Sequence, residues 1–265
     1  MTWPVLQGVQ TPYFVIDEDI LDTNLQILKH VMDESGARIL LAQKAFSVYQ
    51  CYPQIREVLC GSTASGLHEA RLGKEEMGGE THVFCPAYQD YWFDDLLQVA
   101  DHLVFNSLTQ WQHFRDRALA AGKSCGLRIN PMHSTQDHAI YDPCTEGSRF
   151  GILRADLEGV DLTGIDGLHF HTLCEQNVDA LVETLEVVER DFGDLLHVPD
   201  PQVLIGRSLV DAEQHLPGVH GIGQSIEPVV LRLAPLQPPH RPGHGIFHIF
   251  PGTGMGLSLI HISEP

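Results

Sequence analysis

Short apolar segments alternate with amphipathic segments along residues 11–194, and this alternation constrains the fold more than any other feature of the sequence. The apolar segments are continuous, as in "ARILLA", whereas the segments between them repeat apolar residues at helical spacing, as in residues 18–35. Six or more such strand–helix pairs predict an α/β protein with a parallel sheet covered on both faces. An open doubly wound sheet and a (β/α)8 barrel both fit.

The boundaries of the elements follow from the apolar spacing and from helix caps and stops. Ser47 and Ser107 are expected to cap the helices that follow them, and Gly78 and Gly79 to end one. Strands are expected at 11–17, 37–45, 61–65, 81–86, 101–106, 124–130 and 167–173. Helices are expected at 18–35, 48–60, 66–79, 88–100, 107–122 and 177–194.

Polar residues gather where the expected strands end, and this favours the barrel. They are Lys44, Asn106, Arg128, Asn130 and His171. In a barrel the carboxyl ends of the strands form one rim, which is where active sites lie. The sequence also has no G-x-G-x-x-G after a strand, which disfavours a dinucleotide-binding sheet.

Lys44 is unusual among the four lysines of the chain, because it alone follows a buried-looking strand. A lysine at a strand end can extend its ammonium group to solvent. It can also be kept reactive by burial, which lowers its pKa and suits Schiff-base chemistry. The rim position favours the second interpretation.

Charge and composition exclude several partners. The net charge of −19 argues against nucleic acid and anionic membranes. No apolar run reaches the roughly 18 residues that a membrane span needs, and the N-terminus lacks a signal-peptide pattern. Six scattered cysteines without a C-x-x-C pair indicate reduced thiols, so we expect a cytoplasmic protein.

The sixteen histidines raise the question of a metal site. His169 and His171 form the best candidate pair, since residues two apart on a strand face the same side. No third ligand follows at a suitable spacing, so we expect no metal.

Several segments resemble the carboxynorspermidine/carboxyspermidine decarboxylases, which are related to ornithine and diaminopimelate decarboxylases and to alanine racemase. The resemblance runs in order over about residues 10–195. It rests on "TPYFVID", "ILLAQKAFS", "GLHEARLG", "HVFCPAY", "LVFNS", "LRINP", "YDPCTEGSRFGI" and "GLHFHTLCEQ".

The resemblance implies a pyridoxal-phosphate enzyme with the alanine racemase-type barrel. Lys44 would form the covalent link to the cofactor, and His171 would stack on its ring. Arg149 would contact the cofactor or the substrate carboxylate, and Glu175 falls in the substrate site without an assigned role. The implied reaction removes CO2 from a carboxylated triamine to give norspermidine or spermidine.

Two rival functions stay open at the level of sequence. One is a non-catalytic pyridoxal-phosphate-binding barrel, and the other is a diaminopimelate decarboxylase-like enzyme. The segments "HFHTLCEQ" and "DPCTEGSRFG" favour the carboxynorspermidine decarboxylases over both.

The resemblance stops near residue 197. Residues 198–265 hold 10 of the 16 prolines and no lysine. The family's phosphate-binding G-G-G-H segment, its E-P-G-E-A segment and its C-terminal β-domain are not recognised there. We therefore expect the N-terminal portion of a barrel at 1–197 and an atypical tail at 198–265. A slipped reading frame, a divergent natural segment or a fusion would explain this tail, and the sequence favours the first. The family's homodimer is not expected without the β-domain.

Overall fold

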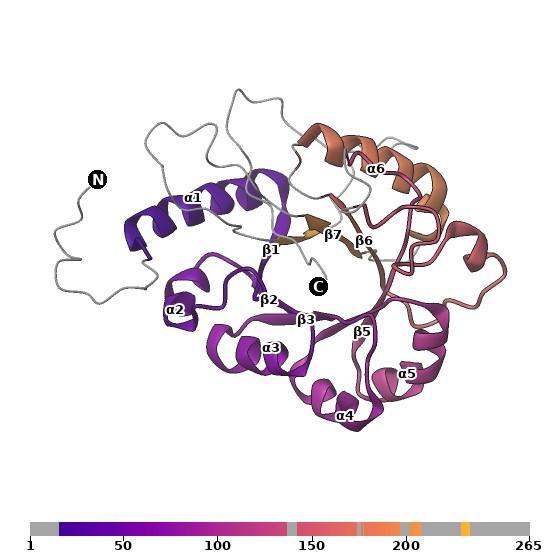
Figure 1. Cartoon of the computed structure of the whole chain (residues 1–265). Coiled ribbons are helices and arrows are strands. Elements are labelled where there is room, and N and C mark those ends of the chain that lie inside the picture. Colours follow the sequence, from indigo (N-terminus) through magenta and orange to yellow (C-terminus); the bar gives the residue numbers. More distant parts are fainter. Residues whose placement is uncertain are drawn as a thin grey trace, which may run out of the picture.

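The chain forms a closed barrel with helices around its outside (Figure 1). The computed structural model describes residues 16–136, 142–173, 176, 178–196, 202–207 and 229–233. Within these ranges, strands β1 to β8 pair in the order of the sequence until β8 meets β1. The prediction of an α/β barrel, rather than an open sheet, is confirmed, whereas the barrel expected to be incomplete is closed by β7 and β8.

Most elements have bounds close to those expected, but the helix expected at 48–60 is much shorter, and β7 and β8 were not expected. The strands are β1 Ala37–Ala42, β2 Gly61–Ala64, β3 Glu80–Phe84, β4 His102–Phe105, β5 Ser124–Arg128, β6 Gly167–Leu173, β7 Gln202–Arg207 and β8 Val229–Leu233. The α-helices are α1 Glu18–Ser35, α2 Tyr52–Ile55, α3 Leu67–Leu72, α4 Asp90–Val99, α5 Leu108–Ala120 and α6 Val178–Phe192. A π-helical turn, Gly73–Met77, extends α3.

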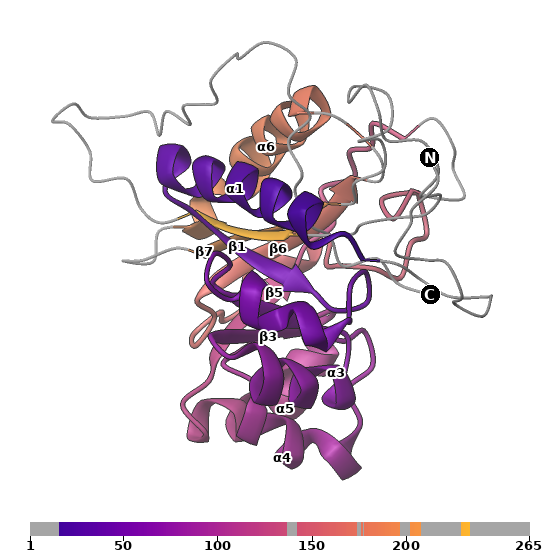
Figure 2. The same ribbon diagram turned by 90° about the vertical axis from the view of Figure 1, so that its left-hand side faces the viewer.

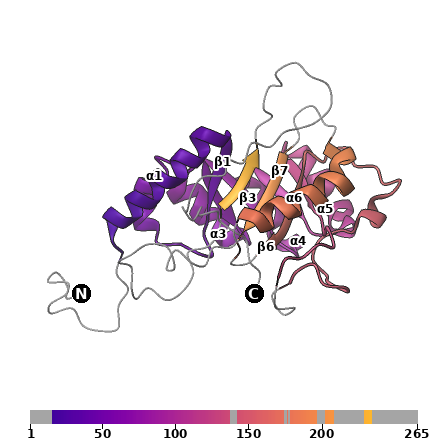
Figure 3. The same ribbon diagram turned by 90° about the horizontal axis from the view of Figure 1, so that it is seen from above.

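Strand β8 makes this barrel differ from an all-parallel one. Strands β1 to β7 pair in parallel, whereas β8 runs antiparallel to both β1 and β7. Figure 3 shows β8, in yellow, between β1 and β7. Strands β7 and β8 therefore lie within residues 198–265, which were expected to form an atypical tail. The domain boundary at residue 197 stays a prediction. Most of the strand expected at 11–17 lies outside the described residues.

Strand β1 shows how side chains divide between the inside and the outside of the barrel. Ile39 and Leu41 pack outward, against Leu25 and Leu28 of α1. Leu40, between them, lies in a separate small core inside the barrel, as alternation along a strand requires. A larger core lies between the other strands and α3 to α6. Figure 2 shows α1 and α6 against the same side of the sheet.

Some helix ends agree with the sequence patterns and others do not. The Ser107 hydroxyl accepts a hydrogen bond from Gln110 N, so the predicted cap of α5 is confirmed. The predicted cap at Ser47 is wrong, because the N-cap residue of the next turn is Val48, whose side chain makes no capping hydrogen bond. That segment forms only a 3₁₀ turn, Tyr49–Cys51, and the short α2. Among the described residues, we find no helix with the length and apolarity needed to cross a bilayer.

Candidate active site

Lys44 lies in a tight turn directly after β1, on the carboxyl rim of the barrel. The strand ends at Ala42, earlier than expected, because the amides of Ala45 and Phe46 both turn back to the Ala42 carbonyl, each at 3.2 Å. The Nζ atom of Lys44 is buried, although the residue as a whole is only partly so. A buried amine is the feature that the Schiff-base interpretation requires.

Gln43 fixes the backbone beside this lysine. Its buried side-chain amide donates to the Glu69 carbonyl at 2.7 Å, and its backbone amide donates to the Thr63 carbonyl at 3.2 Å. Gly73 makes this contact possible, because a Cβ atom there would lie 2.7 Å from Gln43 Nε2 and 2.2 Å from Ser62 Oγ. Helix α3 and the π-helical turn that follows it, outside the barrel, thus hold the turn that carries Lys44.

Arg128, at the end of β5, is buried inside the barrel with 2% of its surface exposed. Its guanidinium carbon lies 4.8 Å from the ring centre of Phe84 and 4.9 Å from that of Phe150. Cation–π contacts of this kind stabilise a desolvated guanidinium group. A permanent positive charge is therefore held inside the barrel at the carboxyl end of the strands.

His169 joins these elements in the middle of β6. Its ring stacks on Phe84, with the centroids 5.2 Å apart. Burial lowers the pKa of His169 well below its ordinary value, and the positive charges of Arg128 and Lys44 lower this pKa further. The imidazole is therefore neutral at physiological pH, and Lys44 and Arg128 both lie within electrostatic range of it.

His171 lies two residues further along β6, on the same side of the strand as His169 and nearer the rim. It is buried. The sequence predicted this rim position, and the structure places it there. The stacking role of His171 stays a prediction.

Asn106, just beyond the end of β4, holds the loop that carries Arg149. Its side-chain amide donates to the Arg149 carbonyl at 3.0 Å, and its side-chain oxygen accepts from Gly151 N at 3.0 Å. Gly151 has a positive φ of 81°, and a Cβ atom there would meet Ile129 backbone at 2.7 Å. The Arg149 side chain itself is exposed, beside the ring of Phe150.

The structure brings together only part of the predicted site. Lys44 and His171 lie at the upper end of the barrel, and Arg149 lies on a loop tied to the rim. Glu175 lies outside the described residues. Sequence reasoning gave no role to Arg128 or Phe84, although Arg128 already stood among the expected rim residues.

Comparison with known proteins relates this barrel to a family. The chain is 40% identical over 187 residues to the carboxynorspermidine/carboxyspermidine decarboxylase of Campylobacter jejuni, and the match covers 71% of the chain and 48% of that protein. Over these 187 residues, the chain is therefore similar to the carboxynorspermidine/carboxyspermidine decarboxylases. It is also 39% identical over 193 residues to carboxyaminopropylagmatine decarboxylase of Synechocystis, covering 73% of the chain and 50% of that protein. No family model matches the chain.

Solved structures give the same relationship. Carboxynorspermidine decarboxylase from Campylobacter jejuni, solved with norspermidine, aligns with a TM-score of 0.64 and 38% identity, over 71% of this chain and 48% of that one. Diaminopimelate decarboxylase from Helicobacter pylori, solved with L-lysine, aligns with a TM-score of 0.63 but only 16% identity, over 72% and 52% of the two chains. The second likeness shows a shared fold alone.

The chain spans about half the length of the curated relatives that it matches. These relatives are named as decarboxylases. The cofactor, substrate and activity of this chain are therefore matters of proposal.

Proposed function

We propose that this protein is a pyridoxal-phosphate-dependent decarboxylase that converts carboxynorspermidine or carboxyspermidine to norspermidine or spermidine. The observation that carries the proposal is the 40% identity to the Campylobacter jejuni enzyme, over a barrel whose rim holds a lysine with a buried Nζ atom. We also propose that the protein is cytoplasmic.

The upper end of the barrel fits such a cofactor. Within the described residues, neither ring nitrogen of buried His169 has a hydrogen-bond partner. An unpartnered polar group of this kind costs free energy unless a ligand or water satisfies it. Lys44 and Arg128 bring two positive charges to the same place, which favours a ligand that carries a phosphate.

Three residues would hold the cofactor. Lys44 would bind it covalently through its amine, His171 would pack its flat ring against it, and Arg149 would contribute a charge from the rim. When bound, pyridoxal phosphate supplies a conjugated ring that accepts the electron pair left behind when CO2 departs. Asn106 would position Arg149 by fixing the backbone of its loop.

The same residues can direct the chemistry at the substrate. Arg149 would orient the substrate carboxylate. When the bond between this carboxylate and the α-carbon breaks, CO2 would leave, and the electron pair left on the α-carbon would pass to the conjugated ring of the cofactor. Nζ of Lys44, placed near the α-carbon, would then return a proton to that carbon. Arg128 and Phe84, which are buried and in contact with each other, would keep water from this end of the barrel interior.

The triamine substrate is favoured over diaminopimelate by sequence. Identity is 38% to the carboxynorspermidine decarboxylase and 16% to diaminopimelate decarboxylase, although the TM-scores are nearly equal. A polycationic substrate also suits a chain with a net charge of −19, since complementary charge speeds encounter.

The test compares two polypeptides. The 265-residue chain and a hybrid that joins its barrel to the remaining half of the Campylobacter jejuni enzyme are assayed for CO2 release from carboxynorspermidine, carboxyspermidine and diaminopimelate. We expect the hybrid to decarboxylate the two carboxylated triamines. We expect essentially no turnover by the 265-residue chain, because this chain spans about half the length of its relatives.

Equal turnover of diaminopimelate would contradict the substrate assignment. Binding of pyridoxal phosphate by both polypeptides, without decarboxylation by either, would favour the non-catalytic barrel instead.

A further inference from the structure

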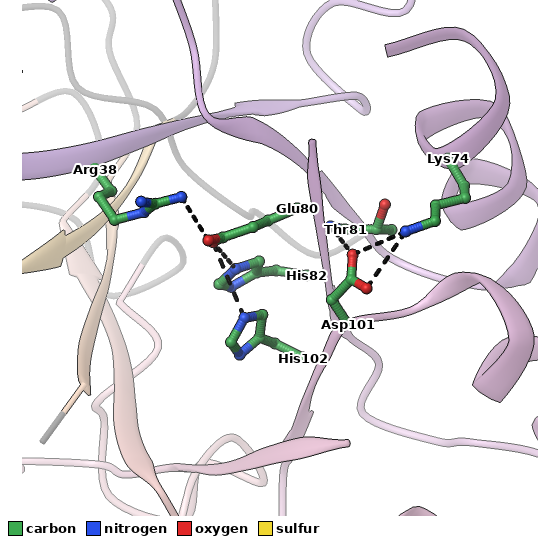
Figure 4. A network of polar contacts seen from close by, with 7 residues as sticks. All are labelled: Arg38, Lys74, Glu80, Thr81, His82, Asp101 and His102. Atoms are coloured by element: carbon green, nitrogen blue, oxygen red, sulfur yellow. Dashed lines mark hydrogen bonds and ion pairs between the residues drawn. The ribbon is translucent and has the colours of Figure 1, made fainter. Parts of the chain in front are cut away.

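A second polar cluster lies inside the barrel at the opposite end from Lys44, where the strands begin (Figure 4). It consists of Glu80 and His82 on β3, His102 on β4 and Arg38 on β1. His82 and His102 are direct neighbours in the β3–β4 pairing. Their rings stack with the centroids 4.0 Å apart, and both face the carboxylate of Glu80.

The two oxygens of Glu80 face different groups. Oε1 accepts a hydrogen bond from Arg38 Nη2 at 2.5 Å. Oε2 lies 3.0 Å from His82 Nε2 and 3.9 Å from His102 Nε2. Arg38 therefore fixes the carboxylate in the orientation that turns Oε2 toward both imidazoles, as residues behind metal ligands commonly do.

The distances suit a small divalent ion. One ligand atom each from Glu80, His82 and His102 lie within 4.8 Å of one another. Ligands about 2.0–2.1 Å from a tetrahedral zinc ion lie roughly 3.3 Å apart, a value between the two Glu80–histidine distances. Small side-chain rotations would place all three atoms about 2 Å from a single metal position.

The chemistry of the ligands narrows the choice of ion. Two imidazole nitrogens with one carboxylate oxygen suit zinc and its neighbours among the first-row transition metals, whereas calcium and magnesium prefer oxygen ligands alone. Three protein ligands would leave a fourth position for water. His82 is 2% exposed and His102 is 13% exposed, so the site would be screened from bulk solvent.

We propose that Glu80, His82 and His102 form a binding site for a divalent transition-metal ion of the zinc class. The ion would join β3 to β4 at the amino end of the barrel. Because it would lie at the end opposite the rim with Lys44, the site would be structural and independent of the proposed decarboxylation.

The rival explanation is an ion pair between Glu80 and a protonated histidine. It would explain the 3.0 Å contact between Glu80 and His82, but a single protonated ring does not require both imidazoles to face the same oxygen. The two explanations differ in whether stability depends on metal, and this difference can be measured.

The experiment uses the complete 265-residue chain, freed of metal with a chelator. Cobalt(II) is titrated in as a spectroscopic probe, and zinc is then added in competition. We expect one cobalt ion to bind with the visible absorption of tetrahedral coordination, and zinc to displace it. Zinc should also raise the unfolding temperature of the chain.

Three variants locate the ion. His102→Gln and Glu80→Gln each remove one ligand, and each should weaken binding on the order of a hundredfold. His113→Gln is the matched control, since His113 pairs with Asp90 at 3.0 Å on the exposed surface. It should bind cobalt as the parent does.

X-ray absorption of the zinc-loaded parent chain gives a test that needs no variant. Two imidazoles and oxygen around the metal are expected. Coordination by sulfur or by more than two imidazoles would overturn the proposal, because the ion would then lie elsewhere. So would the absence of stoichiometric binding, or binding that His102→Gln and Glu80→Gln leave unchanged.

Discussion

The two ends of one barrel carry two polar clusters of opposite design. At the carboxyl end, the positive charges of Lys44 and Arg128 converge on His169, whose ring nitrogens are buried without hydrogen-bond partners among the described residues. At the amino end, the carboxylate of Glu80 contacts Arg38 and His82 directly.

This difference separates the proposed cofactor site from the proposed structural metal site. A cluster of cations around a neutral imidazole gains most from an anion that the chain itself does not supply at that point. A carboxylate that already contacts cations contributes to folding instead. The predictions below test this separation, from the largest expected effect to the smallest.

Removing Lys44 should have the largest effect. After incubation with pyridoxal phosphate and reduction with borohydride, mass spectrometry should find the cofactor on the peptide that holds Lys44, and Lys44→Ala should abolish this label. In the hybrid enzyme we expect a loss of CO2 release on the order of a thousandfold or more, as for other residues that bond covalently during catalysis.

Lys29→Ala is the control for Lys44, because Lys29 pairs with Asp33 at 2.6 Å on the exposed face of α1. Label on Lys29 or Lys123 with Lys44 unmodified would contradict the assignment and remove the contrast between the two ends.

Glu80→Gln should destabilise the fold without affecting the cofactor label. It replaces a partly buried carboxylate with a neutral amide and so removes the charge that pairs with Arg38 and His82. We therefore expect a loss of about 2 kcal/mol in the free energy of unfolding. Urea denaturation measures it. Asp95→Asn, which breaks an exposed pair with Arg71, should cost less than about 0.5 kcal/mol. If Glu80→Gln lost the pyridoxal-phosphate label on Lys44 without losing stability, the amino and carboxyl ends of the barrel would be coupled.

Asn106→Ala should loosen the rim. It leaves the Arg149 carbonyl and the Gly151 amide without a partner in a partly buried place, so we expect a loss of about 2 kcal/mol in stability. In the hybrid enzyme it should also raise KM through Arg149. Asn106→Asp keeps the acceptor for Gly151 but sets a negatively charged oxygen against the Arg149 carbonyl, so it should cost at least as much. Stability equal to that of the parent in both variants would contradict the role of the Asn106 amide.

The amino-end cluster should weaken in acid. The hydrogen bond from His82 and the charges of His82, Arg38 and His102 outweigh burial and lower the pKa of Glu80 from 4.5 to about 2. The folded state therefore binds this proton more weakly than the unfolded chain does. The stabilisation is complete above about pH 4.5 and is lost as the pH falls toward 2.

We expect this loss to amount to about 1–2 kcal/mol, allowing for partial exposure. Urea midpoints measured with chelator between pH 6 and pH 2.5 should show the parent chain and Glu80→Gln converging in acid. Parallel curves would mean that Glu80 does not titrate in this way.

Sequence patterns predicted the local structure well and the contacts across the barrel poorly. Helix α1 has the expected bounds, because Asp17 accepts hydrogen bonds at its start and Gly36 ends it in a left-handed conformation. Lys44 could be placed on the rim because the apolar run before it is local. The local sequence could not exclude a cap at Ser47, because serine is a favourable cap residue; in the structure the N-cap residue is Val48.

The clusters themselves depend on distant pairings. Arg128, Phe84 and Phe150 meet only because β3, β5 and a later loop converge after the barrel closes. The sequence contains one indication of the amino-end cluster, namely the two-residue spacing of Glu80 and His82 on one strand. The contribution of His102 required the β3–β4 register, which no local pattern provides.

Gly73 lies in the helical layer outside the barrel, yet its lack of a side chain leaves the space that Gln43 occupies beside Lys44. In a mutational survey of the hybrid enzyme, this position should therefore resemble an active-site residue, since the displacement caused by an added methyl group would pass through Gln43 to the turn that carries Lys44. CO2 release should be sensitive to substitution of Gly73 and tolerant of substitution of exposed residues on the same turn, such as Glu75.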